Sequence, residues 1–109
     1  MIVVVFQVEM QDGKAPAYFD LAAELRKELE GIDGFISVER FESLNTPGKY
    51  LSLSFWRDEE AVKAWREHAG HQMAQNLGKR EIFADFRICV AEVIRDYAMA
   101  ERVEEMPKA

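Results

Sequence analysis

Cysteine is nearly absent from this chain: its 109 residues contain one, Cys89. A single thiol cannot form an internal disulfide, and without a cysteine cluster the chain lacks the usual ligands of a structural zinc site. Small domains without disulfides are typical of reducing compartments. The sequence therefore predicts a cytoplasmic protein.

Positive charge is also scarce, with 14 Lys and Arg against 20 Asp and Glu and a formal net charge of −6. Nucleic-acid-binding domains and segments that dock on anionic lipid carry basic surfaces, so we predict neither partner. The apolar run at residues 1–11 is too short to cross a bilayer and follows no basic stretch of a signal peptide. The sequence also has no glycine-rich phosphate loop, nucleotide fingerprint or catalytic serine triad.

Apolar residues are plentiful, at 49% of the chain, and they fall into six successive segments. β-Branched runs predict strands, and apolar residues at helical spacing predict helices. The predicted strands cover residues 2–11, 35–44, 50–56 and 81–97, and the predicted helices cover 18–30 and 58–77. This β-α-β-β-α-β order predicts an α+β, ferredoxin-like domain over residues 1–97, with residues 98–109 as a C-terminal tail.

The two faces of the outer strands differ in character. Alternation places one uniformly apolar set on a face suited to cover by helices: Ile2, Val4, Phe6, Val8, Met10, Ile82, Ala84, Phe86, Ile88, Val90 and Ile94. The opposite face mixes apolar and polar side chains: Val3, Val5, Gln7, Glu9, Phe83, Asp85, Arg87, Cys89, Ala91 and Val93. A water-facing sheet would be more polar, so we expect a second copy of the chain to cover this face and predict a homodimer.

The second predicted helix carries the residues best suited to chemistry. Trp65, His68, His71 and Gln75 follow one flank at intervals of three and four residues. Imidazole transfers protons near neutral pH, and an indole suits a planar ligand. The alternative is that Trp65 fills the core and the histidines lie at its wet edge. We take Trp65, His71 and His68 as candidate catalytic residues.

Other functional groups are less specific. His68 and His71 could share a metal ion, but zinc needs three or four ligands and no strong third is evident, so we predict no metal site. Gln7 and Arg87 could line a cavity, or Arg87 could pair with a carboxylate, because an unpaired buried guanidinium is costly. The candidate substrate-binding residues are Gln7, Gln75, Phe83 and Arg87.

Several motifs resemble the antibiotic biosynthesis monooxygenase domain family, whose members are dimeric α+β barrel proteins. The resemblance covers about residues 1–97 and rests on the element order and on four stretches: YLSLSFW at 50–56, EAVKAW at 60–65, H-x-x-H-x-x-x-Q at 68–75 and FADFR at 83–87. It implies a homodimer whose two sheets meet, with a pocket in each subunit between the sheet and the helices. The fold hosts several activities, so the site must decide the reaction.

Members similar to polyketide-tailoring monooxygenases oxidise phenolic or quinol substrates with O₂ and without flavin or metal. A deprotonated phenol can itself pass an electron to O₂, so the protein needs to bind the ring, orient it and stabilise the anion. The resemblance implies that Trp65 contacts the ring and that His71 or His68 handles the proton. We predict a cofactor-independent monooxygenase of an aromatic, phenolic or quinone-type molecule.

Two alternatives remain open. Haem-degrading members use an Asn on the first strand, a Trp on the second helix and a ligating His ten residues after that Trp. Here Gln7, Trp65 and Gln75 stand at those positions. Amides are poor iron ligands, which disfavours haem unless His71 ligates from the neighbouring turn. The second alternative is a non-enzymatic dimeric protein that only binds a small molecule.

Overall fold

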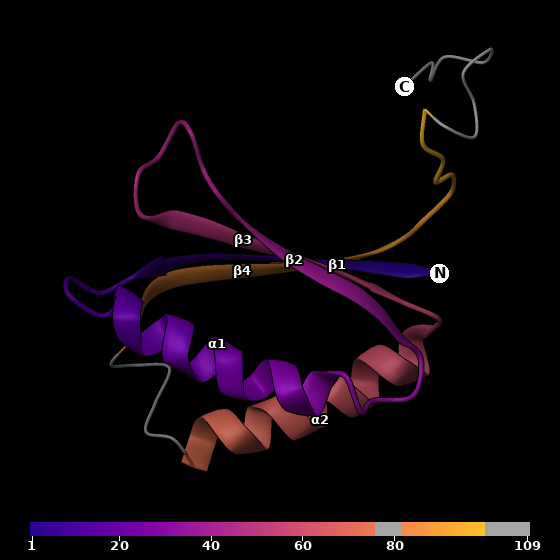
Figure 1. The fold of residues 1–109 in the computed structure, drawn as a ribbon, viewed down its shortest axis with the longest axis horizontal. Coiled ribbons are helices and arrows are strands. Elements are labelled where there is room, and N and C mark those ends of the chain that lie inside the picture. The colour runs from indigo at the N-terminus through magenta and orange to yellow at the C-terminus, as the bar shows by residue number, and fades with distance from the viewer. Residues whose placement is uncertain (76–81, 100–109) are drawn as a thin grey trace.

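The computed structural model describes residues 1–75 and 82–99, with the backbone alone for residues 70–75. A four-stranded sheet carries both helices on one side (Figure 1). The elements are β1 (Ile2–Met10), α1 (Ala15–Leu29), β2 (Phe35–Glu42), β3 (Lys49–Trp56), α2 (Glu59–Gln75) and β4 (Phe83–Glu92). The predicted β-α-β-β-α-β order is confirmed.

The sheet order is β2-β3-β1-β4, and every neighbouring pair is antiparallel. This order makes β4 an edge strand beside the central β1. Residues directly opposite one another on neighbouring strands point to the same face. Val4, for example, lies between Ser54 of β3 and Val90 of β4, so all three side chains share a face. The register therefore assigns a face to each residue of the paired strands.

The core lies between the sheet and the helices in two clusters. The first contains Ile2, Leu29, Trp56 and Ala61, and the second contains Val8, Tyr18 and Phe83. Both clusters use β1 residues of the alternating set that was predicted to face the helices. Trp56 is almost fully buried, and its indole Nε1–H donates to Ser54 Oγ at 2.9 Å. The largest core side chain thus keeps its polar group satisfied.

The predicted face of Phe83 is wrong. The β1–β4 register shifts between Glu9 and Met10, so Phe83 pairs with Met10 and turns to the helix side. Its ring lies 5.8 Å from that of Tyr18, inside the second cluster. One extra residue in a strand reverses the face of every residue beyond it, and alternation alone does not reveal such an irregularity.

Several element ends differ from the predictions, and the two largest differences lie at the end of the last strand and the start of the first helix. The last strand ends at Glu92 rather than at residue 97, because Glu92 is paired with Ile2 and β1 extends no further. The first helix begins at Ala15 rather than at residue 18, with Pro16 in its first turn. Proline suits that position because its missing N–H has no helical acceptor there.

Candidate functional site

The helix side of β4 is left partly uncovered. Its apolar side chains are 47%, 54% and 46% exposed: Phe86, Ile88 and Val90. Each is paired across the strands with a helix-side residue of β1 that belongs to the core or packs against it: Val8, Phe6 and Val4. We call Phe86, Ile88 and Val90 the open strip. Exposed apolar side chains facing a helix layer are suited to hold a small apolar ligand.

Trp65 and His68 lie together on α2, as predicted. The Trp65 ring stacks on that of Trp56, with 6.4 Å between centroids, and the His68 ring is 5.7 Å from Trp65. Trp65 also packs against the first core cluster, which borders Val4, the cross-strand neighbour of Val90. Trp65 therefore fills core, while its cluster adjoins the open strip.

His68 forms a polar link between the two helices. Its Nε2 lies 3.0 Å from Glu28 Oε2 on α1, and both side chains are about two-fifths exposed. A carboxylate within hydrogen-bond distance of an imidazole nitrogen fixes the orientation of the ring. The sequence analysis missed Glu28, because 40 residues separate it from His68.

The other two candidates on α2 are His71 and Gln75. The helix backbone runs through both, but their side chains lie outside the described residues. Their predicted roles stay predictions.

Gln7 and Arg87 are cross-strand neighbours on the sheet face away from the helices. The sheet therefore separates them from Trp65, and within one protomer they cannot line the same pocket as Trp65. Among the described residues of a single chain, no carboxylate lies within ion-pair distance of Arg87. The candidate substrate-binding residues thus divide between the two faces, with Phe83 buried on the helix side.

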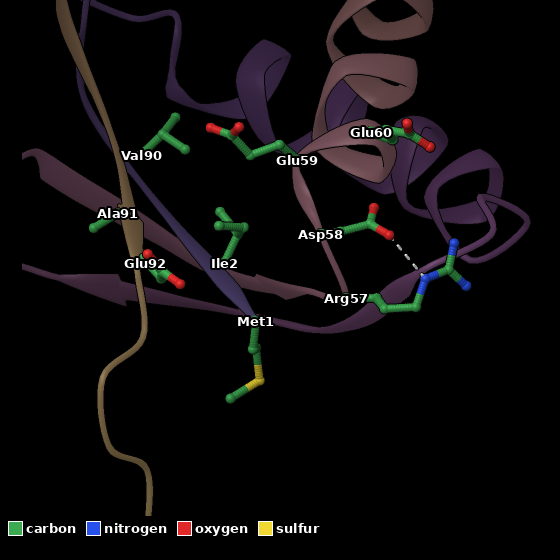
Figure 2. Close-up of a pocket in the computed structure, with 9 residues that line it drawn as sticks. All are labelled: Met1, Ile2, Arg57, Asp58, Glu59, Glu60, Val90, Ala91 and Glu92. Carbon is green, nitrogen blue, oxygen red and sulfur yellow. Dashed lines mark hydrogen bonds and ion pairs between the residues drawn. The ribbon is translucent and has the colours of Figure 1, made fainter.

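A surface depression of about 630 Å³ lies where β1, β4 and α2 meet (Figure 2). Its lining consists of Met1, Ile2, Arg57, Asp58, Glu59, Glu60, Val90, Ala91 and Glu92. It adjoins the open strip at Val90 but includes neither Trp65 nor His68. We place the candidate site on the open strip, because small-molecule sites are lined mostly by apolar side chains and this depression is rimmed by carboxylates.

Ion pairs hold the arginine of that depression in place. Arg57 donates two bonds to Asp33 and one to Asp58, all at 3.1 Å (Figure 2 shows the second partner). Hydrogen bonding to Arg57 lowers the pKa of Asp33. The pKa of Asp58 is lowered chiefly by the Ala61 backbone N–H, which donates to its Oδ1 at 2.9 Å. This bond confirms Asp58 as the cap of α2.

A buried phenol lies at the opposite end of the helix layer. Burial raises the pKa of Tyr18, and the nearby Arg40 guanidinium opposes that rise. Arg40 stands over the Tyr18 ring, 5.5 Å from its centroid, and over the ring of Phe19. This cation–π contact ties β2 to α1.

Metal and haem binding can be tested on the donor groups. Among the described side chains, those of residues 1–69 and 82–99, no three His, Cys, Asp or Glu groups gather closely enough to hold a metal ion. The residues with described side chains do not fit haem either. Gln7 faces away from the helices, and His68 Nε2 is engaged by Glu28.

Neither helix, over the part of the chain that the structure describes, is long and apolar enough to cross a bilayer.

A family model for antibiotic biosynthesis monooxygenase matches residues 1–77. The chain belongs to the antibiotic biosynthesis monooxygenase family. It is 43% identical over 93 residues to the protein named Jasmonate monooxygenase ABM of Pyricularia oryzae, covering 85% of this chain and 43% of that protein. It is 28% identical over 72 residues to the uncharacterized protein YqjZ of Bacillus subtilis, and this match covers 66% of this chain and 61% of that protein. The chain thus spans less than two thirds of either relative.

Solved structures share the fold of this family member. Rv0793 from Mycobacterium tuberculosis has a TM-score of 0.76 at 17% identity, covering 89% of this chain and 98% of that one. PA3566 from Pseudomonas aeruginosa has a TM-score of 0.71 at 13% identity, covering 86% of this chain and 94% of that one. A variant of MhuD with two manganese protoporphyrin IX molecules per active site has a TM-score of 0.70 at 20% identity, covering 90% and 99%. At such identities the likeness establishes the fold alone.

Proposed function

We propose that this family member is a cofactor-independent monooxygenase that oxidises a small aromatic, phenolic or quinone-type molecule with O₂. The observation that carries the proposal is the open strip, whose apolar side chains are exposed on the helix side next to the cluster of Trp65. The strip and Trp65 hold the ring. The His68–Glu28 pair, or His71 on the next turn, takes the phenolic proton.

The reaction needs no external reductant. The phenolate gives one electron to O₂, and the resulting substrate radical and superoxide combine through a new C–O bond. The hydroperoxide then loses water and leaves a carbonyl. In sum, a ring CH₂ of the keto tautomer and O₂ become C=O and H₂O, so the substrate supplies all the electrons. The protein contributes proton removal and the positioning of the ring.

Oxygen consumption by Trp65→Phe, His68→Ala and His71→Ala with a panel of quinols and anthrones tests this proposal. We expect the histidine that serves as base to lower turnover by about 100-fold when removed, the usual contribution of general base catalysis. Trp65→Phe should mainly weaken substrate binding, because it keeps a ring but reduces its area.

Lys27→Ala, an exposed substitution on α1, is the matched control and should leave turnover unchanged. Circular dichroism verifies that each variant is folded. Unchanged turnover in all three site variants would refute their assignment. Quinol binding without oxygen consumption would instead support the non-enzymatic binding protein, and a Soret shift on titration with hemin would support haem binding.

A second substrate class is favoured by the relative named Jasmonate monooxygenase ABM. Two of the three open-strip side chains, Ile88 and Val90, are aliphatic and suit an alicyclic molecule with a hydrocarbon chain. Oxygen insertion into a C–H bond with release of water consumes two electrons, so the assay with jasmonic acid includes a reduced nicotinamide as donor. A product heavier by one oxygen atom, with no turnover of quinols, would select this class.

We also propose that the protein is a cytoplasmic homodimer joined through the sheet face away from the helices. The register places a row of half-buried apolar side chains there: Val3, Val5, Leu51, Leu53 and Phe55. Arg87 lies on the same face with no ion-pair partner among the described residues of its own chain, so a partner subunit can supply one. Equilibrium sedimentation at micromolar concentration should give twice the 12.6 kDa of one chain. The cytoplasmic location rests on the single cysteine.

A further inference from the structure

Two exposed apolar side chains lie at diagonally opposite corners of the sheet. Leu44, in the turn between β2 and β3, is 99% exposed, and Ile94, just after β4, is 85% exposed. β2 and β4 are the two edges of the sheet. The β2–β3 turn lies at the end of the sheet where Val8 of β1 is paired with β3. β4 ends at the other end of the sheet, beside Ile2. The register alone therefore assigns these side chains to opposite corners.

Both corner segments rise on the side of the sheet away from the helices. In Figure 1 the β2–β3 turn and the chain after β4 stand above the sheet, while both helices lie below it. The half-buried apolar row of the sheet lies between them, flanked on β2 by Phe41, which is exposed. The apolar row of this face thus lies between two corners that each expose an apolar side chain.

Hydrogen bonds donated by backbone N–H groups hold both segments in place. In the turn, the Asn45 and Thr46 N–H groups donate to Ser43 Oγ at 3.2 and 3.1 Å. After β4, the Val93 N–H donates to the Met1 carbonyl at 3.0 Å, which anchors the residue next to Ile94. Side chains presented on ordered backbone lose less entropy on binding, so these corners are prepared for a contact.

This arrangement is self-complementary. Two sheets packed face to face are related by a two-fold axis that lies between them, parallel to both. Each copy has two corners, at Leu44 and Ile94, that rise towards the partner, and two corners that do not. When the two-fold axis runs parallel or perpendicular to the strands, the raised corners of one copy lie over the two corners of the other copy that do not rise. Four apolar corners then surround the paired faces without meeting one another. The surface therefore fits a second copy of this chain.

We propose that Leu44 and Ile94 are corner clasps of the homodimer, each seated on the edge of the partner's sheet. The inference rests on the proposed homodimer and adds the residues that set its affinity and orientation. Because the interface is symmetric, every substitution changes two contacts per dimer.

Sedimentation velocity over a concentration series tests the clasps with Leu44→Asp, Ile94→Asp and the double variant. Each single substitution should raise the dimer dissociation constant by about 100-fold or more, because two buried apolar side chains are lost at once. Leu44→Ala and Ile94→Ala should give smaller increases of about 10-fold. Circular dichroism at the same concentrations establishes that the variants are folded.

Ile88→Asp is the control for dimerisation, because it places the same charge on the helix side of the sheet. It should change the dimer dissociation constant by less than about three-fold, because the substituted side chain lies far from the proposed interface. A wild-type protein that sediments as 12.6 kDa would overturn the homodimer itself. A wild-type dimer that the clasp variants leave intact would overturn the clasps alone. Oxygen consumption is not used in either test, so the proposed reaction can fail independently.

Discussion

At the scale of single residues, Gly34 decides how closely the start of α2 approaches β2. Its φ of +93° is unfavourable for any residue with a Cβ, and a Cβ at this position would lie 2.7 Å from that of Ala61. Its carbonyl also accepts the Arg57 N–H at 2.7 Å. A side chain here would therefore push α2 away from the first core cluster, to which Ala61 belongs.

We predict that Gly34→Ala lowers the free energy of unfolding by about 2 kcal/mol or more, from backbone strain and overpacking together. Gly13→Ala isolates the strain, because Gly13 has a φ of +76° and an added methyl group would meet nothing within 4 Å. It should cost about 1 kcal/mol. Urea titration measures both values, and equal losses would show that the contact with Ala61 is unimportant.

At the scale of elements, the chain predicts the order of helices and strands but not all of their ends. The order follows from local patterns: β-branched runs, helical spacing and the Asp58 cap. The end of β4 depends on its neighbour, because pairing stops where β1 begins at Ile2. The face of Phe83 depends on a register shift opposite Met10. The end of β4 and the face of Phe83 therefore depend on how two strands pair, and the sequence of one strand alone does not predict them.

The cap of α2 makes a prediction about pH. The pKa of Asp58 is lowered in the folded protein from its usual 3.8, so its carboxylate stabilises the fold above about pH 4 and loses that effect as the pH falls through the lowered pKa. Asp58→Ala should lower the melting temperature by roughly 3–6 °C at pH 7, and the difference should shrink below pH 3.

Asp58→Asn is the matched variant, because an amide oxygen still accepts the Ala61 N–H without ionising. Its melting temperature should fall less than that of Asp58→Ala at pH 7, and the difference between the two should persist in acid. Calorimetry between about pH 2.5 and 7 measures these melting temperatures, because this interval includes the pKa values usual for carboxyl groups. A pH-independent effect of Asp58→Ala would contradict the ionised cap.

At the scale of the whole molecule, the sheet has one face that belongs to the helices and one that a single chain leaves open. The second face carries Val5 between Leu53 of β3 and Cys89 of β4, near the middle of the sheet. The central place of Val5 makes it the most sensitive position on that face to added charge.

We predict that Val5→Arg raises the dimer dissociation constant by about 100-fold or more, because the two copies bring like charges together in an apolar interface. Its helix-side neighbour on the same strand, Val4→Thr, changes the core instead and should lower stability without dissociating the dimer. Sedimentation and thermal melting together separate these effects. A dimer that tolerates Val5→Arg would place the interface elsewhere.

The candidate site was predictable only in part. The stripe of Trp65 and His68 follows from helical periodicity, which is why their neighbouring rings could be foreseen. Glu28 could not be foreseen, because its approach to His68 depends on how α1 and α2 lie across the sheet. Alternation along β1 predicted that Gln7 faces away from the helices, and the register confirms that the sheet separates it from Trp65.

The sequence by itself determined the family, the order of the elements, the cap of α2 and the face of each β1 residue, because these depend on local patterns of side chains. Only the tertiary structure decided that Phe83 turns inward, that His68 meets Glu28 and that the open strip stays exposed. Those outcomes depend on strand register and on where the helices lie over the sheet. Both are set by packing between segments far apart in the chain.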